Sequence, residues 1–384
     1  MYLARQLNLI EATAHKSCFL FGPRQTGKSM LLRQTLPKGM PIYDLLDHRV
    51  WLDLNTDPTR MRQEIEAKDL RHALVVVDEI QKLPVLLDEI HLLIETRKLR
   101  FLLTGSSARK LRRSGVNLLG GRARSRHLHP FSWKELGSQF VLLTALNHGL
   151  LPSVYFSDDP ADDLRAYVGA YLKEEITAEG LTRNVPAFAR FLEVAAACSG
   201  KMFNKTEVSN DAKVPRTTVI EYFEILKDTL IGYELPAWGR SRKRKAIETA
   251  KFYLFDVGVA RAIQRLPPLV PKSTDFGDAL EHFIFHELKT YIDARQPGCD
   301  LHYWRSTSQF EVDFILGEHT AIEVKATRSV SARDLKGLTA LAEEGVMKHL
   351  LLVCQEPTPR KIGKILVLPW SEFLERLWSD AFVG

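Results

Sequence analysis

The string FGPRQTGKSM, residues 21–30, limits what this chain can fold into more than any other feature of its sequence. It follows an apolar run that predicts a strand and precedes an amphipathic stretch that predicts a helix, with the spacing Gly22-x-x-x-x-Gly27-Lys28-Ser29. The two glycines let backbone N–H groups curl around phosphate oxygens at the positive end of the helix dipole. The lysine can reach the β and γ phosphates, and the serine hydroxyl suits Mg²⁺. Strand, glycine loop and helix in this order predict a P-loop in an α/β domain.

The P-loop prediction names the residues that would contact a nucleotide. We expect ATP or ADP to be bound together with Mg²⁺, and Ser29 to be one ligand of the metal. The expected nucleotide contacts are Gly22, Pro23, Arg24, Gln25, Thr26, Gly27, Lys28, Ser29 and Met30.

A second motif, ALVVVDEIQKLP at residues 73–84, has the composition of a buried strand that ends in acid. Asp78 is the candidate magnesium partner, and Glu79 is the candidate base that orients the attacking water. A third apolar run, residues 99–103, ends in Thr104-Gly105-Ser106-Ser107. Ligands bind at the carboxyl ends of parallel strands, so Ser106 or Thr104 is a candidate sensor of the γ-phosphate. The alternative for these two residues is an ordinary polar strand end.

Composition narrows the class of protein. The 384 residues suffice for two or three domains, and 45% hydrophobic with 26% charged residues is typical of soluble globular proteins. There is no apolar run of about 18 residues, so no transmembrane helix is expected. The N-terminus has no apolar segment like that of a signal peptide. Four cysteines without paired spacing predict reduced thiols in a cytoplasmic protein, with neither zinc nor disulfides.

The positive charge is concentrated in two places. The net charge is +6, and residues 97–126 contain ten Lys and Arg and no acid. A second cluster, in GRSRKRK, contains Arg240, Arg242, Lys243, Arg244 and Lys245. Such clusters suit a polyanion, of which nucleic acid is the commonest. The alternatives are a solvated basic face, or an arginine that contacts a neighbouring subunit's ATP.

The chain divides into three expected domains: 1–140, 141–265 and 266–384. The first alternates strand and helix around the P-loop, which predicts a doubly wound α/β domain. The second is mostly helical and contains a helix-turn-helix pattern, with helices expected at 205–210 and 216–228. The strand-like segments on either side of GRSRKRK would form a wing. Expected DNA contacts are Arg216, Thr217, Arg242, Lys243, Arg244 and Lys245, with Lys213 and Thr218 beside them. Winged helices also serve as modules that only pack against protein.

The third domain carries a pattern of acids and a lysine. A helix at 277–294 precedes three strands, a helix and a fourth strand. Alternation predicts Phe310, Val312 and Phe314 on one face of a strand and Glu311 and Asp313 on the other. If the next strand forms a hairpin with it, Asp313 and Glu323 converge on one cation with Lys325 beside them.

Two carboxylates suit Mg²⁺, which would activate water for cleavage of a phosphodiester. The spacing Asp-x9-Glu-x-Lys matches the PD-(D/E)XK nuclease pattern. Asp313 and Glu323 are the expected metal ligands, Glu281 is the expected further acid, and Glu287 is its rival. The alternative is a salt-bridged strand pair without catalysis, in which Lys325 and arginines such as Arg305 neutralise the acids.

Together these strings resemble bacterial and archaeal AAA-type ATPases fused to a C-terminal winged helix and a PD-(D/E)XK-like domain, a group catalogued as a domain of unknown function. The matching strings are GPRQTGKS, VVVDEIQKLP, LLTGSSARKL, LLGGRA, YFEILKDTLIGYELP, KFYLFDVGVAR, ALEHFIFHEL and FEVDFIL with AIEVKA. The resemblance implies ATP hydrolysis and a ring in which a neighbour's arginine completes each site. Arg122 is the candidate arginine, with Arg113, Arg124 and Arg126 as rivals. The second sensor arginine of AAA proteins has no clear match.

The function expected from these features is an ATP-driven, oligomeric motor acting on DNA, with branched DNA as a plausible substrate. A homo-oligomer is expected, a hexamer in particular, and the C-terminal site would cut or grip the DNA. One rival is a signalling switch in which ATP controls assembly with a protein partner and the nuclease-like domain is a binding module. The other is a defence or toxin-type nuclease restrained by ATP.

Overall fold

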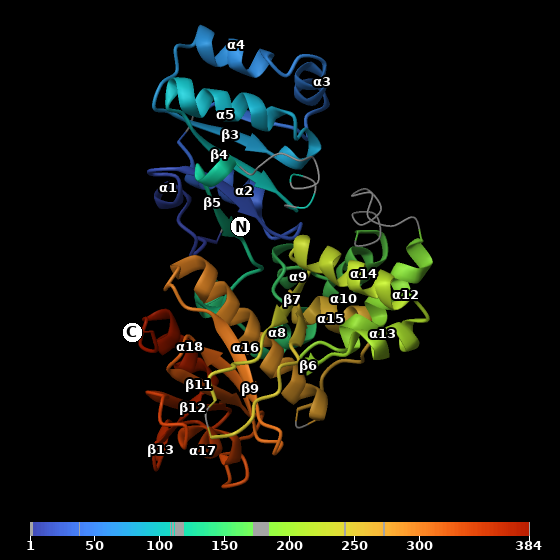
Figure 1. The fold of residues 1–384 in the computed structure, drawn as a ribbon, viewed down its shortest axis with the longest axis vertical. Coiled ribbons are helices and arrows are strands. Elements are labelled where there is room, and N and C mark those ends of the chain that lie inside the picture. Colours follow the sequence, from blue (N-terminus) through green and yellow to red (C-terminus); the bar gives the residue numbers. More distant parts are fainter. Residues whose placement is uncertain are drawn as a thin grey trace. The chain divides into compact units, whose positions relative to one another are not determined.

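The structure, a computed structural model, describes residues 3–37, 39–107, 109, 111, 119–171, 184–241, 243–271 and 273–383 (Figure 1). The chain forms two compact units. The N-terminal unit comprises Met1–Pro130 with Asp228–Ile231, and the C-terminal unit comprises Phe131–Lys227 with Gly232–Gly384. All four cysteines are free thiols. Within the described residues, no helix combines the length and apolar character needed to cross a bilayer.

A five-stranded parallel sheet organises the N-terminal unit, as the α/β prediction requires. Its strand order is β2-β3-β4-β1-β5, so the P-loop strand β1 lies between β4 and β5. The strands are β1 Ser17–Phe21, β2 Ile42–Asp44, β3 Leu74–Asp78, β4 Arg100–Gly105 and β5 Ala123–His127. The helices are α1 Leu9–Ala12, α2 Lys28–Thr35, α3 His48–Thr56, α4 Arg60–Ala67 and α5 Leu86–Arg97, with short helices at Ile80–Lys82 and Leu119–Gly121.

Helices cover both faces of this sheet, which explains why its central strands are apolar throughout. Val75 and Val77 face one core, to which α3, α4 and α5 contribute Leu54, Met61 and Ile90. Val76 faces the other core with residues of α1 and α2. Figure 1 shows the two groups of helices on opposite sides of the sheet. Adjacent residues of one strand therefore point into different cores, and the carboxyl ends of the strands stay available for a site.

The C-terminal unit begins with helices and a small antiparallel sheet of order β6-β8-β7. The first helices are α7 Trp133–Leu136, α8 Leu142–His148, α9 Pro152–Tyr155, α10 Pro160–Ala166 and α12 Val185–Ala197, with short helices at Gly137–Gln139 and Tyr167–Tyr171. Then come β6 Lys201–Met202, α13 Lys205–Ala212, α14 Arg216–Asp228, β7 Gly232–Leu235, β8 Lys251–Leu254 and α15 Val257–Ile263. The predicted helix pair is present, and the second helix has the predicted bounds.

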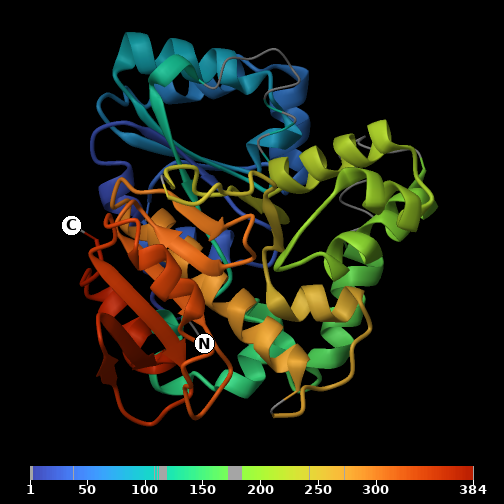
Figure 2. The ribbon, with the colours of Figure 1, turned by 60° about the horizontal axis from the view of Figure 1, so that its bottom comes forward.

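A six-stranded mixed sheet of order β13-β14-β12-β11-β10-β9 completes the C-terminal unit (Figure 2, orange to red). Its elements are α16 Thr274–Arg295, β9 Leu301–Arg305, β10 Glu311–Leu316, β11 Thr320–Val324, α17 Lys336–Ala342, β12 His349–Cys354, β13 Arg360–Ile362, β14 Ile365–Pro369 and α18 Trp370–Trp378. The expected hairpin of β10 and β11 is present, with Phe314 opposite Ile322. The strands β13 and β14 and the helix α18 are additions that sequence patterns did not indicate.

A β-bulge in β10 contradicts one expectation. Alternation predicted Val312 and Phe314 on the same face, but the pairing of β10 with β9 shifts register between Val312 and Ile315. Val312 and Ile315 consequently pack in one core with residues of α17, whereas the Phe314 ring lies 6.4 Å from the Phe285 ring of α16. The extra residue of a bulge reverses the phase of a strand, and a period of two cannot show where this happens.

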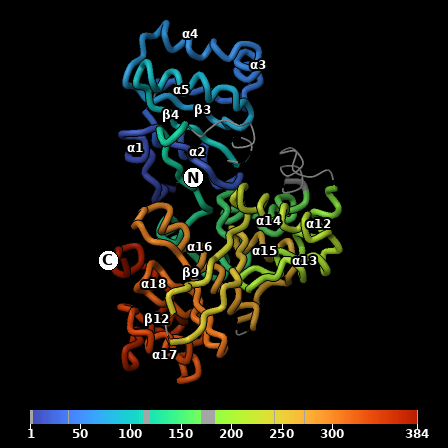
Figure 3. The backbone as a smooth tube through the Cα atoms, viewed as in Figure 1, coloured from blue at the N-terminus to red at the C-terminus, as the bar shows by residue number. Residues whose placement is uncertain are grey.

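The segment between β7 and β8 runs along the outer edge of the six-stranded sheet (Figure 3, yellow beside β9). The backbone N–H of Trp238 donates to the Tyr303 carbonyl at 2.7 Å, and that of Ile247 donates to the Arg305 carbonyl at 2.8 Å. The expected wing is therefore paired with the edge strand β9 along part of its length.

Candidate nucleotide site and carboxylate cluster

The loop between β1 and α2 turns where its sequence allows unusual backbone angles. Gly27 has φ of 91° and Gln25 has φ of 58°, both in the left-handed region. Gly22 is required for a different reason, because a Cβ at this position would lie 2.4 Å from the Leu128 carbonyl oxygen. The loop therefore packs its backbone directly against the chain that follows β5.

Side chains of the loop and of the N-terminal segment hold this conformation. The Thr26 hydroxyl donates to the Pro23 carbonyl at 2.8 Å, and the Arg5 guanidinium donates to the Thr26 carbonyl at 2.7 Å. Lys28 is buried, and its Nζ donates to the carbonyls of Gly22 and Pro23 at 2.7 and 3.0 Å. The lysine thus lies back across the loop. The other predicted contacts Arg24 and Met30 are exposed at its rim.

The two motifs predicted to share a magnesium ion meet in the structure. The Ser29 hydroxyl donates to Oδ2 of Asp78 at 3.1 Å. Asp78 is only 4% exposed, and its other oxygen accepts a hydrogen bond from the Thr104 hydroxyl. A hydroxyl and a carboxylate at the mouth of a phosphate loop are oxygen ligands of the kind that Mg²⁺ takes. The residues present therefore fit the metal that the sequence motif implies.

Glu79 and Ser106, predicted separately, are connected by a residue that sequence reasoning missed. The Gln81 amide donates to the Glu79 carboxylate and, at 3.2 Å, to the Ser106 hydroxyl. Gly105 makes this possible, since a Cβ there would lie 2.5 Å from Oε1 of Gln81. Glu79 itself has φ of 60°, and its N–H donates to the Thr104 hydroxyl at 3.0 Å. The only indication in the sequence is that Gln81 lies two positions after Glu79. This spacing does not predict that the Gln81 amide reaches Ser106.

The candidate arginines lie along β5 and just before it. Arg122 is partly exposed, contacts Glu95, and precedes Ala123, which pairs with Ser17 at the start of β1. The P-loop follows the far end of β1, so Arg122 is roughly 16 Å along the strand direction from its own loop. Arg124 and Arg126 lie within β5, and Arg113 falls outside the described residues.

The residues predicted to contact DNA have different surroundings. Lys213, Arg216 and Thr217 are exposed at the start of α14, whereas Thr218 is half-buried. In the basic turn, Arg244 forms an ion pair of 2.9 Å with Glu343, and the Glu344 carboxylate accepts from the Lys243 backbone N–H at 3.0 Å. Lys243 and Lys245 have exposed side chains, and Arg242 falls outside the described residues.

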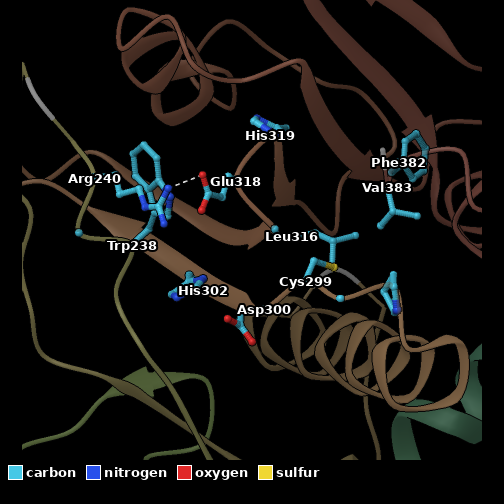
Figure 4. Close-up of a pocket in the computed structure, with 14 residues that line it drawn as sticks. Trp238, Arg240, Cys299, Asp300, His302, Leu316, Glu318, His319, Phe382 and Val383 are labelled. Carbon is cyan, nitrogen blue, oxygen red and sulfur yellow. Dashed lines mark hydrogen bonds and ion pairs between the residues drawn. The ribbon is translucent and has the colours of Figure 1, made fainter.

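A cavity of about 460 Å³ lies where the basic turn meets the C-terminal sheet (Figure 4). Arg240 and Glu318 form an ion pair at its wall, and His302 and Cys299 also line it. The described residues that line the cavity include neither Asp313 nor any other acid of the predicted nuclease-like site. The cavity and that site are therefore separate features.

The predicted acids and lysine of the nuclease-like site do converge. Lys325 Nζ lies 2.6 Å from Oε1 of Glu323, and the Val324 N–H donates to Oδ2 of Asp313 at 2.8 Å. Burial raises the pKa of Asp313 to about 6, and the nearby Glu281 carboxylate adds to the rise. Burial and the Asp313 carboxylate also raise the pKa of Glu323 well above its ordinary value. Negative charge is therefore crowded here despite the lysine.

The sequence did not predict that Glu311 and Lys251, the first residue of β8, belong to this carboxylate cluster. Lys251 is 3% exposed, and its Nζ lies 2.7 Å from Glu311 Oε1, 3.1 Å from Glu281 Oε1 and 3.7 Å from Asp313 Oδ1. Burial alone would lower the pKa of Lys251, but Tyr253 and these carboxylates hold it well above its ordinary value. A lysine at the start of the apolar run 251–255 was a weak signal of a buried charge.

The rival acid Glu287 lies elsewhere. Its carboxylate accepts from the Trp133 backbone N–H at 2.6 Å and from the Trp378 indole at 3.1 Å. Complete burial raises its pKa to about 8. Glu281, not Glu287, is the helix α16 acid beside Asp313. Within the described residues, no group of three or more His, Cys, Asp or Glu side chains is arranged to hold a metal ion. The cluster as folded does not fit the divalent cation that its sequence pattern implies.

Comparison with protein families finds a described domain in the part of the chain that contains the first of these two sites. Residues 14–137 match the family described as AAA domain. The N-terminal unit carries an AAA-type P-loop ATPase domain. The rest of the chain matches two families without assigned function, described as Domain of unknown function (DUF8612) at residues 141–269 and Domain of unknown function (DUF4143) at residues 276–373.

Similar whole proteins come from mycobacteria. The chain is 25% identical over 323 residues to Uncharacterized protein Rv2008c of Mycobacterium tuberculosis, covering 81% of this chain and 70% of that protein. Uncharacterized protein Mb2031c of Mycobacterium bovis matches with the same identity and coverage.

Two solved structures show distant similarity. The Aeropyrum pernix Orc1 protein in complex with DNA aligns at 16% identity and a TM-score of 0.28, over 68% of this chain and 91% of that one. A signal transduction ATPase with numerous domains from Pyrococcus horikoshii, which has a tetratricopeptide repeat sensor, aligns at 12% identity and a TM-score of 0.25, over 76% and 47%.

Proposed function

We propose that this chain hydrolyses ATP and works as a homo-oligomeric motor on DNA. The observation that carries the ATPase part is the 3.1 Å hydrogen bond between Ser29 and Asp78. It joins two motifs 49 residues apart at the mouth of a preformed phosphate loop. An α/β sheet binds its ligand at this edge, where the loops after its strands gather.

Each residue of the site has a role that its contacts support. Ser29 and Asp78 would hold Mg²⁺, which would offset charge on the phosphates. Lys28 would exchange its carbonyl partners for phosphate oxygens, because these carry more negative charge. Glu79 would accept the proton of the attacking water. Gln81 holds the Glu79 carboxylate, and Thr104 orients Asp78.

The oligomeric part rests on where Arg122 lies. It stands at the amino edge of the sheet, away from its own P-loop, and is partly exposed. An arginine placed in this way is suited to a neighbouring subunit's nucleotide, with Arg113, Arg124 and Arg126 as alternatives. We retain a hexamer as the proposed assembly. Mixing Arg122→Ala with Lys28→Ala subunits should restore part of the activity that each variant lacks.

The DNA part rests on exposed cations in the C-terminal unit. Lys213 and Arg216 flank the start of α14, the end of a helix that binds phosphate most readily. Lys243 and Lys245 extend from the basic turn. Contacts of this kind are mainly with phosphates, so affinity should fall steeply with salt and depend weakly on base sequence.

The ion pairs of the basic turn favour a second candidate function. Glu318 and Glu343 neutralise Arg240 and Arg244, which reduces the charge available to DNA. This pairing is expected of a module that packs against protein. The chain would then be an ATP-controlled signalling or defence switch in which the C-terminal unit binds a partner.

The ATPase rate of the full chain, measured with single-stranded, duplex and branched DNA, separates the two candidates. Stimulation by DNA that disappears in Lys28→Ala supports the motor. A DNA-dependent rate that is unaltered when Lys243 and Lys245 are both replaced by Ala would remove the basic turn from the DNA interface. A rate that no form of DNA changes would contradict the motor and favour the switch.

A further inference from the structure

The carboxylate cluster already contains a cation, and it is supplied by the chain itself. We propose that the Lys251 ammonium takes the place of the divalent metal implied by the Asp313, Glu323 and Lys325 pattern, so that the folded protein binds neither Mg²⁺ nor Mn²⁺ there. The cluster would then be an electrostatic clamp between β8 and the C-terminal sheet, not a nuclease centre. This inference concerns the nuclease-like site predicted from the sequence and does not depend on the proposed ATP hydrolysis.

The position of Lys251 is the first argument. Its Nζ lies within 3.7 Å of carboxylate oxygens from Glu281, Glu311 and Asp313, which come from α16 and β10. A metal ion bound by these carboxylates would need their oxygens at about 2.1 Å from a shared centre. The ammonium lies among the oxygens of Glu281, Glu311 and Asp313, so a metal ion that used Asp313 Oδ1 together with either of the other two carboxylates would compete with it for the same space.

The anchoring of Lys251 is the second argument. It belongs to β8, the middle strand of its sheet, and pairs with Met202 on one side and Leu235 on the other. Its side chain is almost completely buried. A lysine on a flexible loop could move away together with its backbone to admit a metal, whereas the backbone of this one is held on both sides in a central strand.

The partners of the carboxylates are the third argument. Glu281 also accepts from the Tyr253 hydroxyl at 2.6 Å, Glu311 also pairs with Arg305 at 3.0 Å, and Glu323 pairs with Lys325. Oε2 of Glu323 is the one oxygen of the cluster that is buried without a hydrogen-bond partner, among the described residues. Removing the charge of Lys251 would leave the Glu281, Glu311 and Asp313 oxygens around one vacated position, which we expect to be a cation site created by one substitution.

Manganese binding tests the proposal directly. The full chain is prepared with Asp78→Asn, which removes a metal ligand of the P-loop site, and is studied without nucleotide. Free Mn²⁺ is followed by electron paramagnetic resonance. The parent should bind no Mn²⁺ at the cluster, and the variant that also carries Lys251→Met should bind about one Mn²⁺ per chain. Lys289→Met is the matched control, because it removes a lysine that pairs with Asp293 outside the cluster and should add no site.

Two results would overturn the proposal: Mn²⁺ bound by the parent and released by Asp313→Asn, or a folded Lys251→Met variant that binds no more Mn²⁺ than the parent. If Lys251→Met does not fold, the folding of a double variant tests the proposal instead. Lys251→Met with Glu281→Gln removes one charge of each sign and should restore folding, and failure to do so contradicts the clamp. In the chain with Asp78 intact, Lys251→Met should keep the parent ATPase rate, so failure of the ATPase proposal remains distinguishable.

Discussion

The P-loop site and the carboxylate cluster use the same kinds of side chain for opposite purposes. Each combines a buried lysine with carboxylates. In the P-loop site, backbone carbonyls of Gly22 and Pro23 hold the lysine. In the cluster, three carboxylates surround Lys251. A lysine held by carbonyls is ready to exchange them for a more negative ligand, whereas a lysine held by carboxylates already has such a ligand. Residue types alone do not distinguish a binding site from a clamp.

The largest expected effect tests the P-loop side of this contrast. Glu79→Gln should lower the ATP turnover rate by about 10²–10⁴-fold and leave ATP binding unchanged, because only the group that accepts the proton is lost. Phosphate release and the binding of a fluorescent nucleotide measure the two quantities. Glu66→Gln on the exposed face of α4 is the control. Hydrolysis by Glu79→Gln at the parent rate would show that another residue is the base.

A loss of stability tests the proposal that Lys251 holds β8 against the C-terminal sheet. Lys251→Met should lower the free energy of unfolding of the C-terminal unit by about 3–5 kcal/mol, since it leaves buried carboxylates without their cation. Arg265→Met removes an ion pair with Glu193 that is largely exposed, and should cost about 1 kcal/mol or less. Urea unfolding of both variants gives the comparison. Equal effects would mean that Lys251 contributes no more than a surface pair.

A smaller effect is expected at Gln81, whose hydrogen bond holds the Glu79 carboxylate of the P-loop site in place. Gln81→Leu should lower the turnover rate roughly 10–100-fold without weakening ATP binding, because Gln81 positions the Glu79 carboxylate and touches Ser106. Gln63→Leu, on α4, should have no effect on turnover. If Gln81→Leu instead weakens ATP affinity and leaves turnover intact, Gln81 acts on the shape of the pocket and not on Glu79.

The last expected effect depends on pH and concerns an acid held by neutral donors. Glu287 accepts from Trp133 and Trp378, and burial raises its pKa from 4.5 to about 8. A raised pKa favours the protonated form in the folded protein, so this stabilisation is complete below pH 4.5 and is lost as pH rises through about 8. Glu287→Gln should flatten the fall in stability between pH 5 and 8, by up to about 1.4 kcal/mol per pH unit. The free energy of unfolding is measured against pH for the parent and for Glu287→Gln. Parallel curves for the two proteins would contradict the raised pKa of Glu287.

Features carried by one short motif could be predicted from the sequence. The strands before the P-loop and before Asp78 are apolar throughout, and parallel strands bring their carboxyl ends to one edge, so the meeting of Ser29 and Asp78 follows from local pattern. The helix pair before β7 and the β10–β11 hairpin followed from periodicity in the same way.

Contacts that depend on tertiary packing could not be predicted. Lys251 and Asp313 are 62 positions apart, and nothing in either strand shows that they meet. The bulge in β10 reverses which residues face α16, and Gln81 reaches Ser106 only because Gly105 leaves space. Each of these depends on a neighbour that is remote in the sequence. The same side chains, read without that neighbour, predicted a metal site, and the fold adds the Lys251 ion pairs that the pattern did not indicate.

The pairing of the basic segment with β9 also affects how copies of this protein behave toward one another. An unpaired edge strand is a template on which another chain can add a strand, and proteins protect such edges. One edge of the six-stranded sheet is β13, only three residues long, with exposed Arg360 and Lys361. The other edge, β9, and the residues directly after it pair with residues 236–238 and 245–247 of the same chain. The segment thus works as a built-in barrier to aggregation, and shortening it would create an open edge on which the protein could self-associate.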